Sequence, residues 1–569
     1  MNPLELIKTR IAKNLIKLYP STSESTFVEL LEETRHKQHG DLSLPCPRLK
    51  LGKPIDIAKN IASHCAANPI EHVVNVGTSG PFINFTIDPK WYTFEILQHV
   101  ISDSGFGSNT SGAGKTCIVE FSSPNIAKPF HAGHMRGTIM GNILGNILRM
   151  NGYKVIKMNY LGDWGKQYGL LAVGYNMLGN EQDLLADPIK HLFDVYVEIN
   201  RKAKEDESIH EQARQYFRKM EDGEEEALAL WRKFRELSID MYKKIYKRLN
   251  VEFDVYSGES FYNEKSLQQV ADLVADHGLT KHDNGADVID MTDKKMGVVV
   301  FKKSDGTTTY ISRDVAAAID RYKEYKFDKM YYVIGSQQEL HMRQLYQILR
   351  DLKLPFADKC EHIQFGLIQG MSTRNGDVVF LKDILDSVQD ETLEIMKKNE
   401  HKFKDIEDPK LVADFIGLSA ILIQDLQARR ILGYTFNWDR MLSFEGSTGP
   451  YLQFTHARLC SLMRHHDFEL PTDLGKLDFT TLDESVVDLA KHLIKFPDVI
   501  RRLVDNFEPV GIVRYVMELS QAVASLLSKL IVRDAEGDEK KKMLIVFGCA
   551  KLVLNKGMTI IGLTPVERM

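Results

Sequence analysis

The chain has 569 residues, of which 43% are apolar, and at about 150 residues per domain this length predicts three or four domains with full cores. Its 73 basic and 78 acidic side chains give a formal net charge of −5, which shows no global sign of nucleic-acid binding and leaves any RNA contact to local basic faces. The six cysteines stand far apart without a Cys-x-x-Cys pair, which argues against a zinc site and a disulfide framework and favours a reducing compartment.

The first part of the chain, residues 1–110, predicts an α+β domain. Helical patterns at 4–18 and 55–67 accompany a strand-like run at 80–87, and a stretch dense in glycine and serine follows as a linker. The first helix carries Glu5 among basic residues, unlike an acid-poor transit peptide, so we expect a cytoplasmic protein, with a mitochondrial location as the alternative. No uninterrupted apolar run approaches about 18 residues, so we expect no membrane span.

Residues 117–160 predict a strand, a helix and a second strand that form a βαβ unit. Residues 117–121 are apolar and β-prone, and Pro124 and Pro129 exclude a helix before His131. A helical pattern begins at Gly137, and its glycines, spaced every four residues, suggest close packing on the sheet. Ligands of such units bind beyond the carboxyl end of the first strand.

His131 and His134 stand at the expected start of this helix. Imidazoles at a helix start can donate hydrogen bonds to phosphate oxygens, and Gly133 leaves room for a phosphate or a flat base against the backbone. A His-x-x-His pair alone is equally compatible with two structural histidines at a helix cap.

The rest of the chain predicts an α/β region followed by helices. A highly charged helical stretch at about 176–237 precedes strand signals at 297–301 and 330–334, and from Asp408-Pro409 onward the pattern is almost wholly helical. We therefore predict a multidomain α/β plus α protein. Its parts are an N-terminal α+β domain (1–110), a Rossmann-type parallel-sheet catalytic domain with a helical insertion (111–400, insertion about 176–237) and a C-terminal all-α bundle (401–569).

Five segments together resemble one family. Residues 121–134 and 159–165 closely resemble the signature region of arginyl-tRNA synthetases, which are class I aminoacyl-tRNA synthetases of the His-Ile-Gly-His type. The resemblance continues in order through 304–314, 370–374 and 564–569. It implies ATP-dependent activation of L-arginine to arginyl-adenylate with release of pyrophosphate, then transfer to the 3′ end of tRNA(Arg). It also implies Mg²⁺ with the ATP, no structural metal, and a monomer.

The resemblance assigns the catalytic groups to two loops. Adenylate formation places charge on the α-phosphate and on pyrophosphate, which positioned donors can stabilise without a protein nucleophile. Both lysines of the family's mobile Lys-Met-Ser-Lys-Ser loop are absent here, and the resemblance implies that a lysine upstream of the first histidine compensates. The implied catalytic residues are Lys128, His131, Gly133, His134, Met371, Ser372 and Arg374.

Arginine recognition requires carboxylates, because a planar guanidinium presents five donors in a fork. Asp314 and Glu120 match the family's arginine-site acids, and Tyr310 matches the tyrosine that packs on the substrate. The remaining positions that match the arginine site, several of them at its α-amino and carboxylate ends, are Ser123, Asn125, His134 and Gln338.

Two regions match tRNA-binding parts of the family. Phe82 and Asn84 correspond to contacts with an exposed D-loop base, although Ser79 replaces an expected asparagine nearby. Residues 444–458 resemble the segment that meets the anticodon stem and loop, where an aromatic ring can stack and an arginine can bind phosphate. The candidates there are Tyr451, Gln453, His456 and Arg458.

Three other readings of the chain fit less well. Residues 111–116 resemble the end of a P-loop, yet Asn109 replaces its first glycine and a strand follows where a helix is required. A small adenylyltransferase would not need about 160 helical residues after its catalytic half. A catalytically silent tRNA-binding scaffold is disfavoured by the intact histidines, Lys128, Tyr310 and Asp314.

Overall fold

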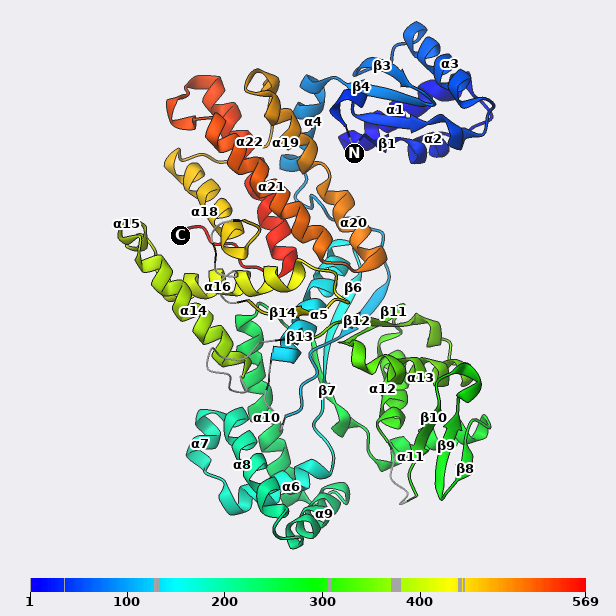
Figure 1. The fold of residues 1–569 in the computed structure, drawn as a ribbon, viewed down its shortest axis with the longest axis vertical. Coiled ribbons are helices and arrows are strands. Elements are labelled where there is room, and N and C mark those ends of the chain that lie inside the picture. The colour runs from blue at the N-terminus through cyan, green and yellow to red at the C-terminus, as the bar shows by residue number, and fades with distance from the viewer. Residues whose placement is uncertain are drawn as a thin grey trace. The chain divides into compact units, whose positions relative to one another are not determined.

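The fold is taken from a computed structural model, which describes residues 2–34, 36–126, 130, 132–304, 309–369, 380–437, 443 and 446–569 (Figure 1). Contacts between residues divide the chain into two compact units. The first unit comprises Met1–Gly107, Thr455–Val499 and Tyr515–Lys556, and the second comprises Ser108–Phe454, Ile500–Arg514 and Gly557–Met569.

The first unit begins with a four-stranded antiparallel sheet in the order β1-β2-β4-β3. The alternating pattern of β4 buries Ile83 and Phe85, and Gly80, at a φ of 57°, closes the turn between β3 and β4. This confirms the predicted N-terminal α+β fold. The elements are α1 (Pro3–Leu18), α2 (Glu24–Leu30), β1 (Glu32–Glu33), β2 (Leu42–Pro45), α3 (Pro54–Ala67), β3 (Val73–Ser79), β4 (Phe82–Ile87) and α4 (Pro89–Ser102).

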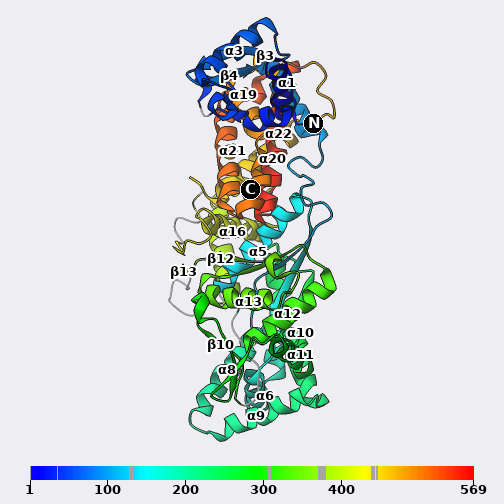
Figure 2. The same ribbon diagram turned by 90° about the vertical axis from the view of Figure 1, so that its right-hand side faces the viewer.

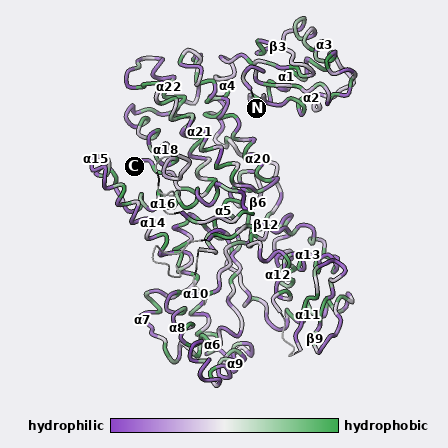
Figure 3. Tube along the Cα trace, viewed as in Figure 1, coloured by the Kyte–Doolittle hydropathy of each residue, from purple (hydrophilic) through white to green (hydrophobic). Residues whose placement is uncertain are grey.

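Helices from the end of the chain complete the first unit. They are α19 (Glu484–Leu493) and the larger parts of α18 (Gly449–His465), α21 (Val510–Lys529) and α22 (Gly537–Ile561), while α20 (Phe496–Asn506) lies mostly in the second unit. Val510–Asp534 and Gly537–Ile561 are long and apolar enough in composition to cross a membrane. Half of the first apolar window and 72% of the second are buried inside the protein, so burial in a helical core accounts for much of this apolar content (Figure 3).

The second unit is built on a five-stranded parallel sheet in the order β12-β11-β5-β6-β7. The predicted βαβ unit and Rossmann-type sheet are confirmed. Helix α5 begins at Ala132, five residues before the predicted apolar pattern starts. The first turn of α5, which contains Gly133 and His134, shows no apolar periodicity, so the sequence pattern did not predict it as helical. The elements are β5 (Thr116–Glu120), α5 (Ala132–Met150), β6 (Lys154–Leu161), β7 (Val255–Gly258), β11 (Lys329–Gly335) and β12 (Cys360–Phe365).

The glycines of α5 allow it to lie close to the sheet. A Cβ on Gly137 would come within 3.1 Å of the Phe365 ring, and one on Gly141 would collide with the Phe121 ring. One on Gly145 would lie 2.5 Å from Cε of Lys157, so a side chain at any of these positions would require a neighbour to shift, most severely at Gly141.

Helices connect β6 to β7 within the second unit, and Asp163 anchors them. Its buried carboxylate accepts hydrogen bonds from Arg235 at 2.6 Å and from the backbone of Ser260 at 2.9 Å, while the Trp231 indole donates to its carbonyl. The signature segment that ends in Gly165 therefore fixes these helices to the sheet. They are α6 (Lys166–Leu178), α7 (Glu181–Ala186), α8 (Pro188–Ala203), α9 (Ser208–Glu221) and α10 (Glu225–Arg248).

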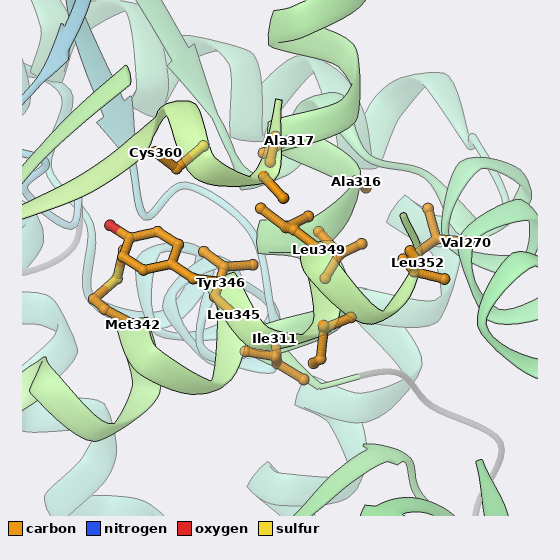
Figure 4. Packing of buried hydrophobic residues seen from close by; sticks show 14 of the residues in the cluster. Val270, Ile311, Ala316, Ala317, Met342, Leu345, Tyr346, Leu349, Leu352 and Cys360 are labelled. Carbon is orange, nitrogen blue, oxygen red and sulfur yellow. The ribbon is translucent and has the colours of Figure 1, made fainter. Parts of the chain in front are cut away.

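A small antiparallel sheet and three helices follow β7. Ile311 and Ala317 on α12 share a buried apolar cluster with Leu345 and Leu349 on α13 (Figure 4), and this packing fixes the face that α12 presents to the parallel sheet. The elements are α11 (Glu264–Asp276), β8 (Lys281–Asp283), β9 (Ala286–Asp290), β10 (Val298–Lys302), α12 (Tyr310–Tyr325) and α13 (Glu339–Asp351). All six are labelled in Figure 1, and α11, α12, α13 and β10 also in Figure 2.

The remaining elements of the second unit are linked to α5 through Arg136. Buried Arg136 of α5 pairs with Asp425 of α16 at 3.2 Å and donates to the carbonyls of Gly366 and Leu432 at 2.6 and 2.9 Å. The signature helix is therefore fixed at its first turns to the chain that follows β12. The elements are β13 (Ile368–Gln369), α14 (Leu381–Lys397), α15 (Glu400–Phe403), α16 (Pro409–Leu426) and β14 (Tyr434–Thr435).

Candidate active site

The loop after β5 has a strained backbone. Ser122 and Ser123 both have positive φ angles, 72° and 46°, which serine adopts only when its surroundings impose them. The Ser122 hydroxyl lies 2.8 Å from that of Tyr246 on α10 and accepts a hydrogen bond from Thr138 on α5 at 2.7 Å. The loop is therefore held from two helices at the carboxyl edge of the sheet, where ligands of this fold bind.

Asn125 continues this loop alongside the end of β6. It forms a parallel bridge with Gly162, and a Cβ on Gly162 would collide with the Asn125 amide. The Tyr242 hydroxyl donates to the Asn125 carbonyl at 3.1 Å. The predicted residues Ser123 and Asn125 thus lie in one loop whose course is fixed by glycine and tyrosine neighbours.

His134 is the third residue of α5 and lies half-buried at the start of that helix. Its ring stacks on Phe130, with centroids 5.4 Å apart, and its carbonyl accepts from the Thr138 hydroxyl. A helix start presents free N–H groups and a partial positive charge, so this position suits a phosphate. Lys128, His131, Met371, Ser372 and Arg374 fall outside the described residues, and their predicted roles stay predictions.

One hydrogen bond links the flanks of the two signature loops. The Leu381 N–H, at the start of α14, donates to the Phe130 carbonyl at 2.7 Å. Phe130 precedes His131, and Leu381 follows the segment that resembles the mobile loop. The two residues are 251 positions apart in the chain, so the flanks of two segments that the family motifs place around one nucleotide meet at described residues.

Tyr310 and Asp314 lie one turn apart on α12, so they share a face of that helix. The Asp314 carboxylate lies 2.6 Å from His341 Nε2 on α13. Tyr310 is 68% exposed, which is unusual for a large ring and leaves its face free to cover a ligand. Gln338 lies exposed between β11 and α13, at the same carboxyl edge.

Glu120 is the last residue of β5, and its side chain is buried. Its Oε2 lies 2.5 Å from Nη1 of Arg321, also buried, on α12. Burial raises the pKa of Glu120, while the Arg321 guanidinium opposes the rise and the charge of Asp314 adds to it. The two predicted arginine-site acids therefore act on each other, and sequence reasoning missed the internal arginine beside them.

A third carboxylate at this edge was also missed. Glu259 directly follows β7, where burial raises the pKa of its carboxyl to about 7; Arg313 opposes that rise, and the charges of Asp163 and Asp314 add to it. Its position in the sequence could have indicated it, because Glu259 follows the last residue of a parallel strand and Glu120 is itself such a last residue.

Glu259 is expected to make stability depend on pH. Its folded pKa of about 7 exceeds the ordinary 4.5, so the folded protein keeps a proton that the unfolded chain loses between these values. Stability from this group should therefore fall as pH rises through that window, by on the order of 1 to 3 kcal/mol. Melting temperatures of Glu259→Gln and wild type should diverge from pH 5 to pH 8 in favour of the variant. Exposed Glu264→Gln is the control, and parallel curves for Glu259→Gln would contradict the assignment.

The predicted tRNA contacts divide into exposed and buried residues. Phe82, 43% exposed, and half-buried Asn84 lie on β4, and Tyr451 and Arg458 are half-buried and exposed on α18. Gln453 and His456 are 0% and 2% exposed. The Gln453 amide bonds Thr564 and Val566, and the His456 ring lies 3.1 Å from the Asn555 amide. These two side chains therefore have internal partners, and their predicted contact with RNA stays a prediction.

Comparisons with known families cover most of the chain. The family described as "tRNA synthetases class I (R), catalytic domain" matches residues 96–438. The "DALR anticodon binding domain" matches residues 452–569, and the "Arginyl tRNA synthetase N terminal domain" matches residues 5–87.

Curated relatives and solved structures agree with these matches. The cytoplasmic arginine–tRNA ligase of Saccharomyces cerevisiae is 44% identical over 100% of this chain and 95% of its own, and the mitochondrial enzyme of that yeast is 43% identical over 100% and 89%. The fold matches arginyl-tRNA synthetases from Thermus thermophilus (TM-score 0.78, 20% identity, 99% of each chain) and Plasmodium falciparum (TM-score 0.77, 22% identity, 100% and 99%). The chain therefore belongs to the arginyl-tRNA synthetases, within the class I aminoacyl-tRNA synthetases.

Proposed function

We propose that this protein activates L-arginine with ATP and transfers it to the 3′ end of tRNA(Arg). The arginine carboxylate attacks the α-phosphate, pyrophosphate leaves, and the terminal adenosine of the tRNA then accepts the arginyl group. The observation that carries the proposal is the pair of acids, Glu120 and Asp314, beside the strained loop and the start of α5 at the carboxyl edge of a parallel sheet.

The proposed roles follow the chemistry of each group. Asp314 and Glu120 receive the guanidinium, and Tyr310 covers the substrate. His131, Gly133 and His134 face the phosphates, and ATP enters with Mg²⁺. Arg374, with Met371 and Ser372, adds charge to the phosphates, as the resemblance of residues 370–374 to the family's Lys-Met-Ser-Lys-Ser segment implies. The α-amino and carboxylate ends of arginine are held by Ser123, Asn125 and Gln338.

The tRNA is proposed to contact both ends of the chain. Phe82 and Asn84 meet the D-loop, and Tyr451 and Arg458 meet the anticodon stem and loop. Residues 1–110 and 401–569 are then the tRNA-binding domains, and 111–400 is the catalytic domain. We propose that the protein is cytoplasmic and monomeric. Because the relatives include enzymes of both compartments, a comparison of charging of cytosolic and mitochondrial tRNA tests the location. Light scattering tests the oligomeric state.

An arginine-dependent exchange of pyrophosphate into ATP, measured with and without tRNA, tests the proposed function. Exchange with arginine, and charging of tRNA(Arg) when tRNA is present, are the expected results. A silent scaffold would bind tRNA and show neither activity.

Lys128 is expected to be needed for activation, because the loop at 370–374 lacks the lysines that would otherwise stabilise pyrophosphate. Lys128→Ala should lower the exchange rate by about 10²-fold, the typical cost of one donor to developing charge. Thr373→Lys in that background should recover part of the rate. Lys154→Ala, at the exposed start of β6, is the control. Full activity of Lys128→Ala would show that Lys128 is not needed and that Arg374, the histidines and Mg²⁺ suffice to stabilise the pyrophosphate.

A further inference from the structure

Arg321 is a buried arginine that no motif of the family signature predicts. One side of its guanidinium meets Glu120 at 2.5 Å, and its Cζ lies 4.9 Å from the Tyr160 ring centroid and 5.7 Å from that of Tyr332. Its Nε and Nη2 have no hydrogen-bond partner among the described residues, so aromatic faces surround much of the group. A buried guanidinium with one carboxylate and unpaired donors is costly, which calls for an explanation.

The sheet and the helix together place this arginine at the arginine site. Tyr332 of β11 pairs in register with Glu120 of β5, and Tyr160 lies on β6, the other neighbour of β5. On α12, Arg321 follows Tyr310 by eleven residues and Asp314 by seven, which returns all three to one face at about 100° per residue. The substrate ring, the substrate acid and Arg321 therefore form one stripe that faces the end of β5.

We propose that Arg321 is a positioning residue that sets arginine specificity by holding the Glu120 carboxylate ionised and oriented at the inner end of the arginine pocket. This inference rests on the proposed function. It assigns Arg321 a role that acts through Glu120, without contact between Arg321 and the substrate. The internal guanidinium lies 2.5 Å from Oε2 of Glu120, so this oxygen already has a charged partner before an incoming guanidinium arrives.

Charge balance supports the assignment. Glu120, Asp314 and Arg321 together carry one net negative charge, which matches a single substrate guanidinium. Without Arg321, the buried Glu120 carboxylate would lose the cation that opposes its protonation, and the nearby charge of half-buried Asp314 would further favour the protonated form, which removes half of the fork that a guanidinium requires. The internal arginine therefore favours the charged form of Glu120 and opposes the burial that raises the pKa of this acid.

The test compares Arg321→Met, Arg321→Lys, Glu120→Gln and the double variant Glu120→Gln/Arg321→Met by pyrophosphate exchange. Arg321→Met should raise the KM for arginine by about tenfold or more, with the KM for ATP changed by less than about twofold. Arg321→Lys should lie between it and wild type, because the charge is kept and the planar fork is lost. Glu120→Gln leaves the Arg321 charge unpaired beside the substrate, so its arginine KM should exceed that of the double variant.

A pH profile separates positioning from a purely structural role. In Arg321→Met the arginine KM should rise as pH falls from about 8 to 6, because Glu120 has lost the cation that opposed its protonation. Wild type serves as the reference profile for the other polar groups of the site. Those facing Glu120 and Asp314 are Tyr160, Tyr262, Tyr332, Tyr346, His341 and Glu259.

Melting curves identify any variant that fails to fold. If Arg321→Met does not fold, the double variant, which removes both buried charges, can still be compared with Glu120→Gln for its arginine KM. Arg350→Met, which breaks an exposed pair with Asp358, is the matched control. Unchanged arginine KM and pH profile in folded Arg321→Met, or a double variant no better than Glu120→Gln, would overturn the inference. Absence of arginine-dependent exchange in wild type would instead refute the proposed function.

Discussion

Asp314→Ala is expected to raise the KM for arginine by at least about 30-fold while the KM for ATP changes by less than about threefold. Removing one partner of a desolvated charge pair costs about 2 to 5 kcal/mol, and each 1.4 kcal/mol is about tenfold in affinity. Asp314 faces the site from the same side of α12 as Tyr310, and His341 holds one of its oxygens at 2.6 Å. The loss should therefore fall on the substrate that carries the guanidinium.

Asp320→Ala is the matched control, because Asp320 lies on the same helix with its side chain 52% exposed and paired to Lys323. Steady-state pyrophosphate exchange with each substrate varied in turn measures both constants. Equal increases in the two KM values for Asp314→Ala would remove Asp314 from the arginine site.

The parts of this fold that the sequence predicted are those set by local spacing. Strand 117–121, the breaks at Pro124 and Pro129 and the apolar period after Gly137 are enough to place β5, the loop and α5. The shared helix face of Tyr310 and Asp314 was not predicted, because α12 already begins at Tyr310.

The contacts that were not predicted join residues far apart in the chain. Glu120 and Arg321 are 201 positions apart, and only the order β11-β5-β6 brings α12 across the end of β5. A single arginine in an amphipathic helix is normally interpreted as a solvent-exposed charge, so no local sequence feature distinguished Arg321 from a surface residue. The internal contacts of Gln453 and His456 were likewise not predicted, because their partners Thr564, Val566 and Asn555 lie about 100 positions further along the chain.

The start of α5 depends on anchors well outside the nucleotide site. Arg136 and Asp425 form a buried pair two residues beyond His134, and Phe130 is packed by Tyr242 and Tyr246 of α10 at 5.4 and 5.5 Å. These contacts fix the helix start before any ligand binds. A phosphate donor is most effective when it needs no reorganisation as charge develops, so the anchoring favours a role of His134 in the transition state.

His134→Ala is therefore expected to slow adenylate formation by about 10² to 10³-fold, the usual cost of removing one donor to developing charge. The KM for arginine and the affinity for tRNA should change by less than about threefold, because the donor acts mainly in the transition state. His134→Gln, which keeps an N–H donor, should retain more activity, and exposed His277→Ala is the control. Single-turnover formation of the adenylate isolates this step from tRNA charging. A large rise in arginine KM at an unchanged rate of adenylate formation would instead support the arginine-binding role that the family motif also implies for His134. A defect confined to tRNA binding would contradict both the phosphate role and the arginine-binding role.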